Sequence, residues 1–333
     1  MNKLKFLWNK LCRADKKQFI ETAKRVSAVT GKATPLVLLD IIGCAVKHGT
    51  GYVDYEAFEI YNMNEEERAG FLTIGRNNAL VRELNDPDYR ILFDNKALFN
   101  QKFEEFIKRD WMLLDSKNQD EFEALLKNKG ELIVKPLDQS CGTGIEKIKC
   151  EDGMDIVAIY NDLMEKDCNL AEELVIQCEE MNALCNTSVN TVRLVTIYNS
   201  DDDIAIAAGA IRIGRAGNFV DNFNHGGLAV ILDPSTGLSV TDGYDKDRNT
   251  YETVPEIGTV LKGFKTPQWE ECKALVTEAA KVVPQVRYVA WDVAVSKDKG
   301  PLLIEGNDYP GQDVTQYPKL GLGTYEAFRK LIK

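Results

Sequence analysis

The chain has 333 residues, with 41 lysines and arginines against 52 aspartates and glutamates, so its net charge is -11. That length allows two domains, and 44% hydrophobic with 28% charged residues is a globular composition. The acidic balance disfavours broad nucleic-acid binding. His48 and His225 are the only histidines and lie far apart in the sequence, which argues against histidine-ligated zinc.

The eight cysteines include no C-x-x-C pair. This excludes a zinc ribbon and a thioredoxin motif and predicts free thiols in a reducing compartment. The N-terminal apolar run is broken early by Asn9 and Lys10, and no stretch approaches the length of a membrane span. We therefore expect a cytoplasmic protein.

Residues 1 to 32 hold nine basic and two acidic residues, so this segment is basic although the whole chain is acidic. Its apolar residues Leu4, Leu7, Trp8 and Leu11 have helical spacing. The pattern is typical of an amphipathic helix that covers its own domain, or of a peripheral contact with an anionic membrane.

From residue 1 to about 90 apolar residues recur at spacings of three and four, which predicts helices. Asn85-Asp86-Pro87-Asp88 then interrupts the pattern and predicts a domain boundary. Beyond it, short β-branched runs alternate with helical segments, which indicates a mixed α+β body. The predicted strands are 131–135, 174–176, 191–197, 204–208, 228–232, 289–295 and 301–305. The predicted helices are 96–109, 119–128, 153–165, 268–282 and 324–332.

Lys135 ends a predicted strand and is followed by a small-residue loop, Ser140-Cys-Gly-Thr-Gly144. Gly142 and Gly144 allow backbone N–H groups to approach an anion, and Lys135 adds a positive charge beside them. The segment is not a P-loop, because the lysine precedes the glycines. It predicts a phosphate-binding loop or, alternatively, a plain β-hairpin. We expect Cys141 to be an inert small side chain.

Asp292 and Glu305 lie on two predicted strands joined by the turn Ser296-Lys-Asp-Lys-Gly300, which predicts a hairpin. Folding places the two carboxylates nearly opposite each other, with Asn307 on the same face as Glu305. Two carboxylates this close repel unless a cation lies between them, and oxygen ligands of this kind suit Mg2+. The alternative is a solvated hairpin with incidental acids.

A phosphate-binding loop and a magnesium site together indicate a nucleoside triphosphate. With Lys96, Glu172-Glu-Leu-Val175 and Asn190-Thr-Val-Arg193, these segments occur in the order seen in ATP-grasp ligases. The chain especially resembles the sugar-transfer-associated, α-L-glutamate-ligase-related ATP-grasp group, which shares its Asn-Thr-x-Arg and Asp-Asn-Phe-x-x-Gly-Gly stretches. The resemblance covers roughly residues 90 to 330.

The resemblance implies an α+β ATP-grasp fold, in which two α+β subdomains grip ATP, with a helical N-terminal domain. Residues 1–90 would form that helical domain, a possible acceptor or docking region. Residues 91–333 would form the ATP-grasp domain, divided into a lid-bearing subdomain (91–172) and a metal- and substrate-binding subdomain (173–333).

The resemblance also implies a set of ATP-binding residues. These are Lys96, Lys135, Ser140, Gly142, Gly144, Glu172, Leu174, Val175, Glu179 and Glu180. The two lysines resemble those that hold the phosphates, and the glycine loop resembles the lid over them. Glu172, Leu174 and Val175 fall where the family binds adenine through its backbone, and Glu179 or Glu180 would bind the ribose.

Arg212 matches the family's catalytic arginine, whose guanidinium suits the negative oxygens of an acyl phosphate. Arg193 is expected to orient the acceptor carboxylate, although either arginine could instead form a structural salt bridge. His225 would act as an acid/base or as a hydrogen-bond donor. Residues expected to contact substrate are Asn190, Asn222, Gly226 and Gly227. Two Mg2+ ions would be held by Asp292, Glu305 and Asn307, with Glu305 bridging.

The resulting hypothesis is an ATP- and Mg2+-dependent carboxylate-amine ligase that forms ADP and an amide through an acyl phosphate. The resemblance implies a carboxylate on a uronic-acid-containing sugar or a peptide, an amino acid as the amine, and a role in surface polysaccharide biosynthesis. Two alternatives remain. One is a phosphotransferase acting on a sugar hydroxyl, and the other is a non-catalytic nucleotide-binding module.

Overall fold

The computed structural model describes residues 16–138, 144–215, 217, 223, 226–247, 249–317 and 323–333. These residues form two compact units, one of Met1–Glu83 with Gly311–Lys333 and one of Leu84–Pro310. The sequence-based division assigned the last 23 residues, 311–333, to the larger domain, but they pack with the N-terminal helices. Gln316 shows why: its side chain accepts from the Leu72 N–H at 2.7 Å and donates to the Leu72 carbonyl at 2.9 Å.

The smaller unit is helical, as its apolar periodicity predicts. Its helices are α2 (Lys16–Thr30), α3 (Thr34–His48), α4 (Tyr52–Ala57), α5 (Glu65–Gly70), α6 (Ile74–Leu84) and α14 (Tyr325–Leu331). Their inner faces share a core that includes Val26, Ile41, Tyr55 and Phe71. No single described helix is long and apolar enough to span a membrane, and α2 and α3 pass that test only as a pair bent by 114°.

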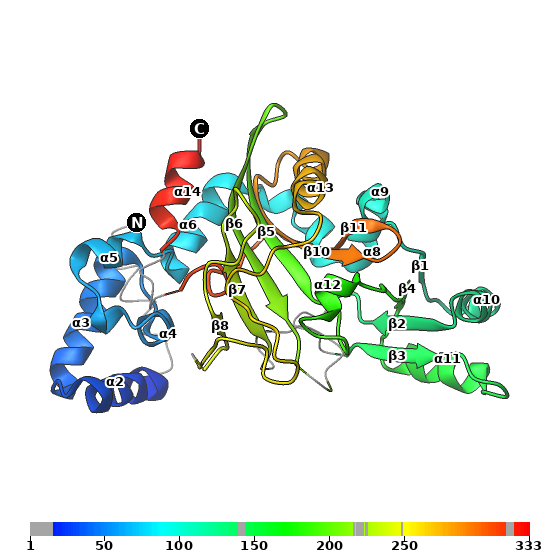
Figure 1. Cartoon of the computed structure of the whole chain (residues 1–333), viewed down its shortest axis with the longest axis horizontal. Helices are drawn as coiled ribbons and strands as arrows, with labels where there is room; N and C mark the ends of the chain where they lie inside the picture. The colour runs from blue at the N-terminus through cyan, green and yellow to red at the C-terminus, as the bar shows by residue number, and fades with distance from the viewer. Residues whose placement is uncertain are drawn as a thin grey trace. The chain divides into compact units, whose positions relative to one another are not determined.

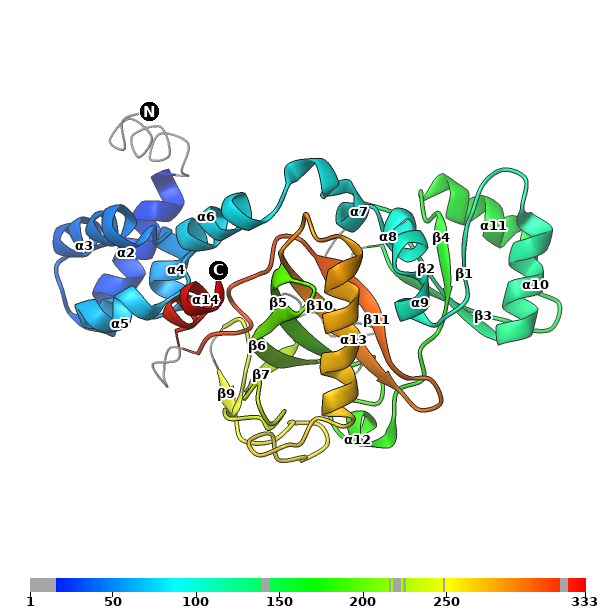
Figure 2. The ribbon, with the colours of Figure 1, turned by 90° about the horizontal axis from the view of Figure 1, so that it is seen from above.

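A seven-stranded antiparallel sheet forms the centre of the larger unit, in the order β11-β10-β5-β6-β7-β8-β9 (Figure 1). Its strands are β5 (Thr191–Ser200), β6 (Asp203–Ile213), β7 (Leu228–Leu232), β8 (Gly243–Tyr244), β9 (Thr250–Tyr251), β10 (Tyr288–Ser296) and β11 (Gly300–Asn307). Helix α13 (Trp269–Val282) packs across β5 and β10 (Figure 2). Its buried residues Cys272, Val276 and Ala279 join the sheet's core, which makes β10 a strand buried along its whole length.

A second, four-stranded antiparallel sheet has the order β1-β4-β2-β3. Its strands are β1 (Trp111–Leu113), β2 (Glu131–Lys135), β3 (Glu146–Lys149) and β4 (Leu170–Glu173), and helices α10 (Gln119–Lys129) and α11 (Ile156–Glu165) share its core. Three short helices, α7 (Ile91–Asp94), α8 (Lys96–Lys102) and α9 (Glu104–Ile107), precede this sheet, and α12 (Glu179–Asn182) follows it.

Two predicted elements differ from the structure. The predicted strand 174–176 is wrong, because β4 ends at Glu173, the last residue that its neighbouring strand β2 pairs with. The predicted helix 96–109 is two helices, α8 and α9, which meet at Phe103. The remaining predicted strands, and the helices after residue 110, are present within a few residues. The described cysteines are free thiols.

Candidate active site

Asp292 on β10 and Glu305 on β11 are directly paired in the antiparallel ladder. This pairing depends on a β-bulge, since Val293 pairs with Leu303 and the next pair skips one residue. Without the bulge, the register set by the turn would put Ile304 opposite Asp292. The inserted residue therefore brings the two carboxylates together.

Arg193 and Arg212 both contact Asp292. Arg193 on β5 makes a two-pronged ion pair, with Nε 2.7 Å from Oδ1 and Nη2 2.7 Å from Oδ2, and Arg212 on β6 places Nη1 2.8 Å from Oδ2. Burial would raise the pKa of Asp292, but the two guanidinium charges outweigh it and hold the pKa well below its usual value. Burial and the adjacent Asp292 carboxylate raise the pKa of Glu305. Asp292 is thus ionised within a cluster of opposite charges.

The donor set at this place fits a magnesium ion that is also bound by phosphate. The atoms that Asp292, Glu305 and Asn307 could offer to a metal ion are all oxygens. The amide nitrogen of Asn307 donates to Glu305 Oε1 at 3.4 Å. Among the described ranges, no group of three or more His, Cys, Asp or Glu side chains is arranged to hold a metal ion. Mg2+ commonly takes one or two carboxylates and completes its shell with water and nucleotide phosphates.

Lys135 at the end of β2 forms an ion pair with Glu172 on β4, with Nζ 2.6 Å from Oε2. Oε1 of Glu172 accepts from Asn100 at 2.6 Å and from Arg109 at 3.1 Å. Burial would raise the pKa of Glu172, but the charges of Arg109 and Lys135 lower it to about 2. Sequence patterns gave no signal for Asn100 or Arg109, because their contacts are with residues at least 60 positions away.

Lys96 is the first residue of α8. Its backbone N–H donates to the Leu137 carbonyl at 3.1 Å, which fixes it beside the segment that follows β2. Burial and the charge of Lys135 lower the pKa of Lys96, while the carboxylates of Glu305 and Glu172 act in the opposite direction. The charges of Lys135, Glu172 and Glu305 therefore all act on Lys96.

Four predicted site residues lie outside the described residues, namely Ser140, Gly142, Asn222 and His225, and so does Cys141. Gly144 has a positive φ of 72°. Leu174 and Val175 are half-buried in the segment after β4. Glu179 and Glu180 are both exposed in the first turn of α12, so the choice between them stays open. Gly226, with a φ of 88°, and Gly227 precede β7.

Asn190 does not fit the predicted contact with substrate. It is 0% exposed, and its amide nitrogen donates to the carbonyl oxygens of Met181 and Cys185 at 2.9 and 2.8 Å. Its amide oxygen accepts from the Gly214 N–H at 3.2 Å. Asn190 therefore holds together the loops around β5 and β6, a role that depends on contacts that a local motif does not show.

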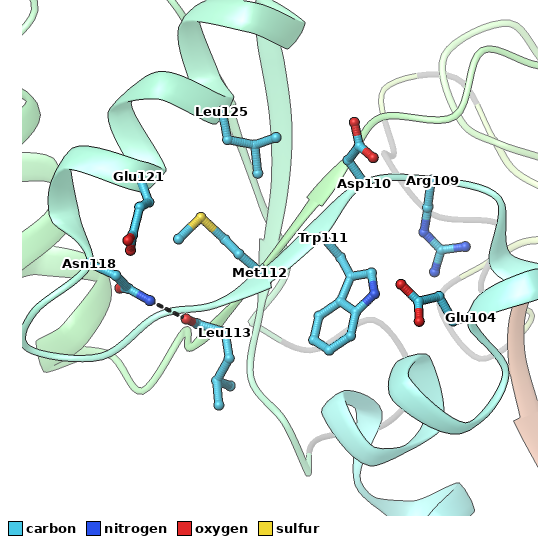
Figure 3. A pocket seen from close by; sticks show the side chains of 9 residues that line it. All are labelled: Glu104, Arg109, Asp110, Trp111, Met112, Leu113, Asn118, Glu121 and Leu125. Carbon is cyan, nitrogen blue, oxygen red and sulfur yellow. Dashed lines mark hydrogen bonds between the residues drawn. The ribbon is translucent and has the colours of Figure 1, made fainter.

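A cavity of about 530 Å3 lies along β1 and α10 (Figure 3). Trp111, Met112 and Glu121 are among its lining residues, and Asn118 donates to the Leu113 carbonyl at its margin. Arg109 also lines it, but none of the predicted site residues does. The cavity therefore borders the Lys135 cluster through Arg109, which contacts Glu172.

The family comparison agrees with this fold. Residues 75–322 match the family described as sugar-transfer associated ATP-grasp. Because the match spans more than half of the sequence, the chain belongs to the sugar-transfer-associated ATP-grasp family. The predicted α+β ATP-grasp fold is thereby confirmed, with most of the N-terminal helices preceding the matched residues.

Solved structures also align with the chain. D-alanyl-alanine synthetase A from Vibrio cholerae is 14% identical, with a TM-score of 0.46 over 74% of this chain and 66% of that one. The D-alanine-D-alanine ligase from Coxiella burnetii is 15% identical, with a TM-score of 0.43 over 77% of this chain and 64% of that one. The chain thus spans less than two thirds of either protein, and similarity this low carries no conclusion about activity. No curated protein matches the chain.

Proposed function

We propose that the protein is an ATP- and Mg2+-dependent carboxylate-amine ligase that forms ADP. The observation that carries this proposal is the direct pairing of Asp292 with Glu305 in a chain of the ATP-grasp family, and the mutual influence of the Lys96 and Lys135 charges supports it. Holding two lysines close enough to repel costs stability, and bound phosphates would offset that cost.

In this proposal the reaction has two steps. The γ-phosphoryl group of ATP moves to a carboxylate oxygen, which gives an acyl phosphate and ADP. The amine nitrogen then attacks the carbonyl carbon, a C–N bond forms, the C–O bond to phosphate breaks, and the amine loses a proton. Such chemistry depends mainly on positioning and on neutralising charge, which suits a site of lysines and arginines.

The residues of this chain would divide the work. Lys96 and Lys135 would hold the ATP phosphates, and Arg212 would stabilise the negative oxygens of the acyl phosphate. Asp292, Glu305 and Asn307 would hold the magnesium. Bound Mg2+ would supply charge neutralisation and polarise the phosphoryl oxygens. Arg193 orients Asp292 in the structure, which favours the structural salt bridge over direct contact with the acceptor.

For substrates, we propose a carboxylate on a uronic-acid-containing sugar or a peptide, with an amino acid as the amine, in surface polysaccharide biosynthesis. The sugar-transfer association of the family supports this choice. A reaction that consumes ATP also supports a cytoplasmic location.

The test is a screen of uronic acids with amino acids for ATP-dependent phosphate release, with hydroxylamine as a trap for the acyl phosphate. A hydroxamate, and ADP formation that requires an amine, support the ligase. A stable phosphorylated sugar formed without an amine would favour the phosphotransferase. Nucleotide binding without turnover of any pair would favour the non-catalytic module. We expect Glu305→Gln and Lys135→Met to abolish activity.

We also propose a peripheral contact between the helical unit and an anionic membrane. On α3, Leu36, Leu39 and Val46 are 61%, 65% and 53% exposed and recur at helical spacing. Between Leu36 and Val46 the only charged residue is Asp40, whose carboxylate is paired with Arg68 at 2.7 Å. An exposed apolar face next to a basic segment is typical of a helix that lies at a lipid surface.

A further inference from the structure

Arg109 is a buried arginine that the proposed reaction leaves without a role. It follows α9 and is 7% exposed. Its Nη2 atom lies 3.1 Å from Oε1 of Glu172 on β4 and 3.3 Å from the carbonyl oxygen of Ile304 on β11, and Nη1 donates to the carbonyl oxygen of Leu303. Arg109 therefore connects the strand that carries Glu172 to the two residues that precede Glu305.

Glu172 shares its one carboxylate between two cations, Arg109 and Lys135. Its Oε1 atom accepts from Arg109 and Asn100, and its Oε2 atom lies 2.6 Å from Nζ of Lys135. These four side chains belong to residues that are at most 8% exposed, so water screens their charges weakly. The cluster keeps one net positive charge. If Arg109 lost its charge, Glu172 and Lys135 would form a neutral pair.

We infer that Arg109 is a positioning residue for nucleotide binding, because by sharing Glu172 it leaves the positive charge of Lys135 available to phosphate. This inference rests on the proposed function, in which Lys135 binds ATP. Arg109 needs no contact with the nucleotide for this effect. A buried lysine fully compensated by a carboxylate attracts an anion less strongly than one whose carboxylate is shared.

The test measures the binding of ADP with Mg2+ to the full chain by isothermal titration calorimetry. We expect Arg109→Gln to weaken binding at least about tenfold, and Glu172→Gln to strengthen it. The double variant should recover most of the affinity lost in Arg109→Gln, because Lys135 then has no buried carboxylate beside it. A purely structural role of the Arg109–Glu172 contact predicts instead that Glu172→Gln weakens ADP binding. A double variant that binds ADP no more tightly than Arg109→Gln would overturn the inference.

Lys299→Gln is the matched control. Lys299 lies in the β10–β11 turn, with Nζ 2.6 Å from the carboxylate of Glu173, the residue next to Glu172 on β4. The substitution removes one cation and one contact between β4 and the β10–β11 hairpin but does not touch Glu172. We expect ADP affinity within about twofold of the wild type. Arg109→Lys keeps the charge and should also stay near the wild type, and a tenfold loss there would contradict the charge argument.

Two further measurements keep the test decisive. Should Arg109→Gln fail to fold, as judged by circular dichroism, a tenfold loss of ADP affinity in Glu172→Gln would still overturn the inference. Lys135→Met separates the inference from the proposed function. If Lys135→Met binds ADP like the wild type, the proposed nucleotide site is wrong. If it loses affinity while Arg109→Gln does not, the inference alone is wrong.

Discussion

At the scale of single residues, Gly306 is where the proposed metal site meets the core. It lies between Glu305 and Asn307 on β11, and a Cβ atom added to it would stand 2.9 Å from the rings of Phe99 and Trp291. Trp291 is 1% exposed, and its indole N–H donates to Thr196 Oγ1 at 2.9 Å. The rings therefore have little freedom to move, so a methyl group here would displace the strand.

We expect Gly306→Ala to lower the free energy of unfolding by about 1–3 kcal/mol through overpacking, and to weaken Mg2+-dependent ADP binding. Urea unfolding and calorimetry at several Mg2+ concentrations measure the two effects. Gly243→Ala is the control. Gly243 lies on β8, away from the predicted metal ligands, and its added Cβ would also be too close to a neighbour, 2.5 Å from Leu261 Cδ1. Equal Mg2+ dependence in both variants would count against the assignment of Glu305 and Asn307.

At the scale of elements, the helical unit depends on one close contact between the end of α3 and the start of α6. Gly49 ends α3 with a φ of 67°, and its carbonyl oxygen accepts from the Gly75 N–H at 2.9 Å. A Cβ atom on Gly75 would lie 2.4 Å from that oxygen. By contrast, a Cβ atom on Gly43, within α3, would have no neighbour within 4 Å.

An alanine substitution should have opposite effects on stability at Gly75 and at Gly43. Gly75→Ala should destabilise the helical unit by at least about 1 kcal/mol, because backbone atoms block the methyl group. Gly43→Ala should stabilise it by about 0.5–1 kcal/mol, because alanine loses less entropy in a helix than glycine. Thermal and urea unfolding test both. A destabilising Gly43→Ala would show that α3 is covered by something that the exposed fractions do not reveal.

At the scale of the whole molecule, charge and apolar surface are unevenly distributed. The net charge of the chain is -11, yet residues 1–32 are basic, and α3 exposes apolar side chains close to them in sequence. Lys16, Lys24 and Lys32 are exposed in the described part of this region. Each lysine near an anionic lipid surface contributes about 1 kcal/mol. An acidic molecule with this one basic and apolar segment would meet a membrane through that segment.

We therefore expect the protein to float with vesicles that contain phosphatidylglycerol, but not with neutral phosphatidylcholine vesicles, and less so at high salt. Leu39→Asp should abolish flotation, because it puts a charge in the apolar face of α3. Val157→Asp, at a 52% exposed position on α11, is the control and should float like the wild type. Analytical ultracentrifugation in parallel measures self-association. If the wild type forms a dimer but does not bind vesicles, and Leu39→Asp loses the dimer, the apolar face of α3 binds a second copy of the chain and not a membrane.

The site shows how far local sequence patterns reach. The lysine at the end of β2 and the presence of both acids on the β10–β11 hairpin were predictable, because the strands and the turn can be identified from local patterns. The buried Arg109 and the structural role of Asn190 were not, because their partners come from other strands and loops. Residue type alone also could not distinguish Glu172 as the partner of Lys135 from Glu172 as part of an adenine-binding strand.

The sequence by itself determined the positions of most helices and strands and the family, because hydrophobic periodicity and motif order are local properties of the chain. The net charge and the scarcity of histidine likewise argued against broad nucleic-acid binding and histidine-ligated zinc without any structure. Only the tertiary structure decided that residues 311–333 return to the helical unit, that β4 ends at Glu173, and that a bulge sets Glu305 opposite Asp292. Those outcomes depend on pairing and packing between distant segments, where one inserted residue changes which side chains meet.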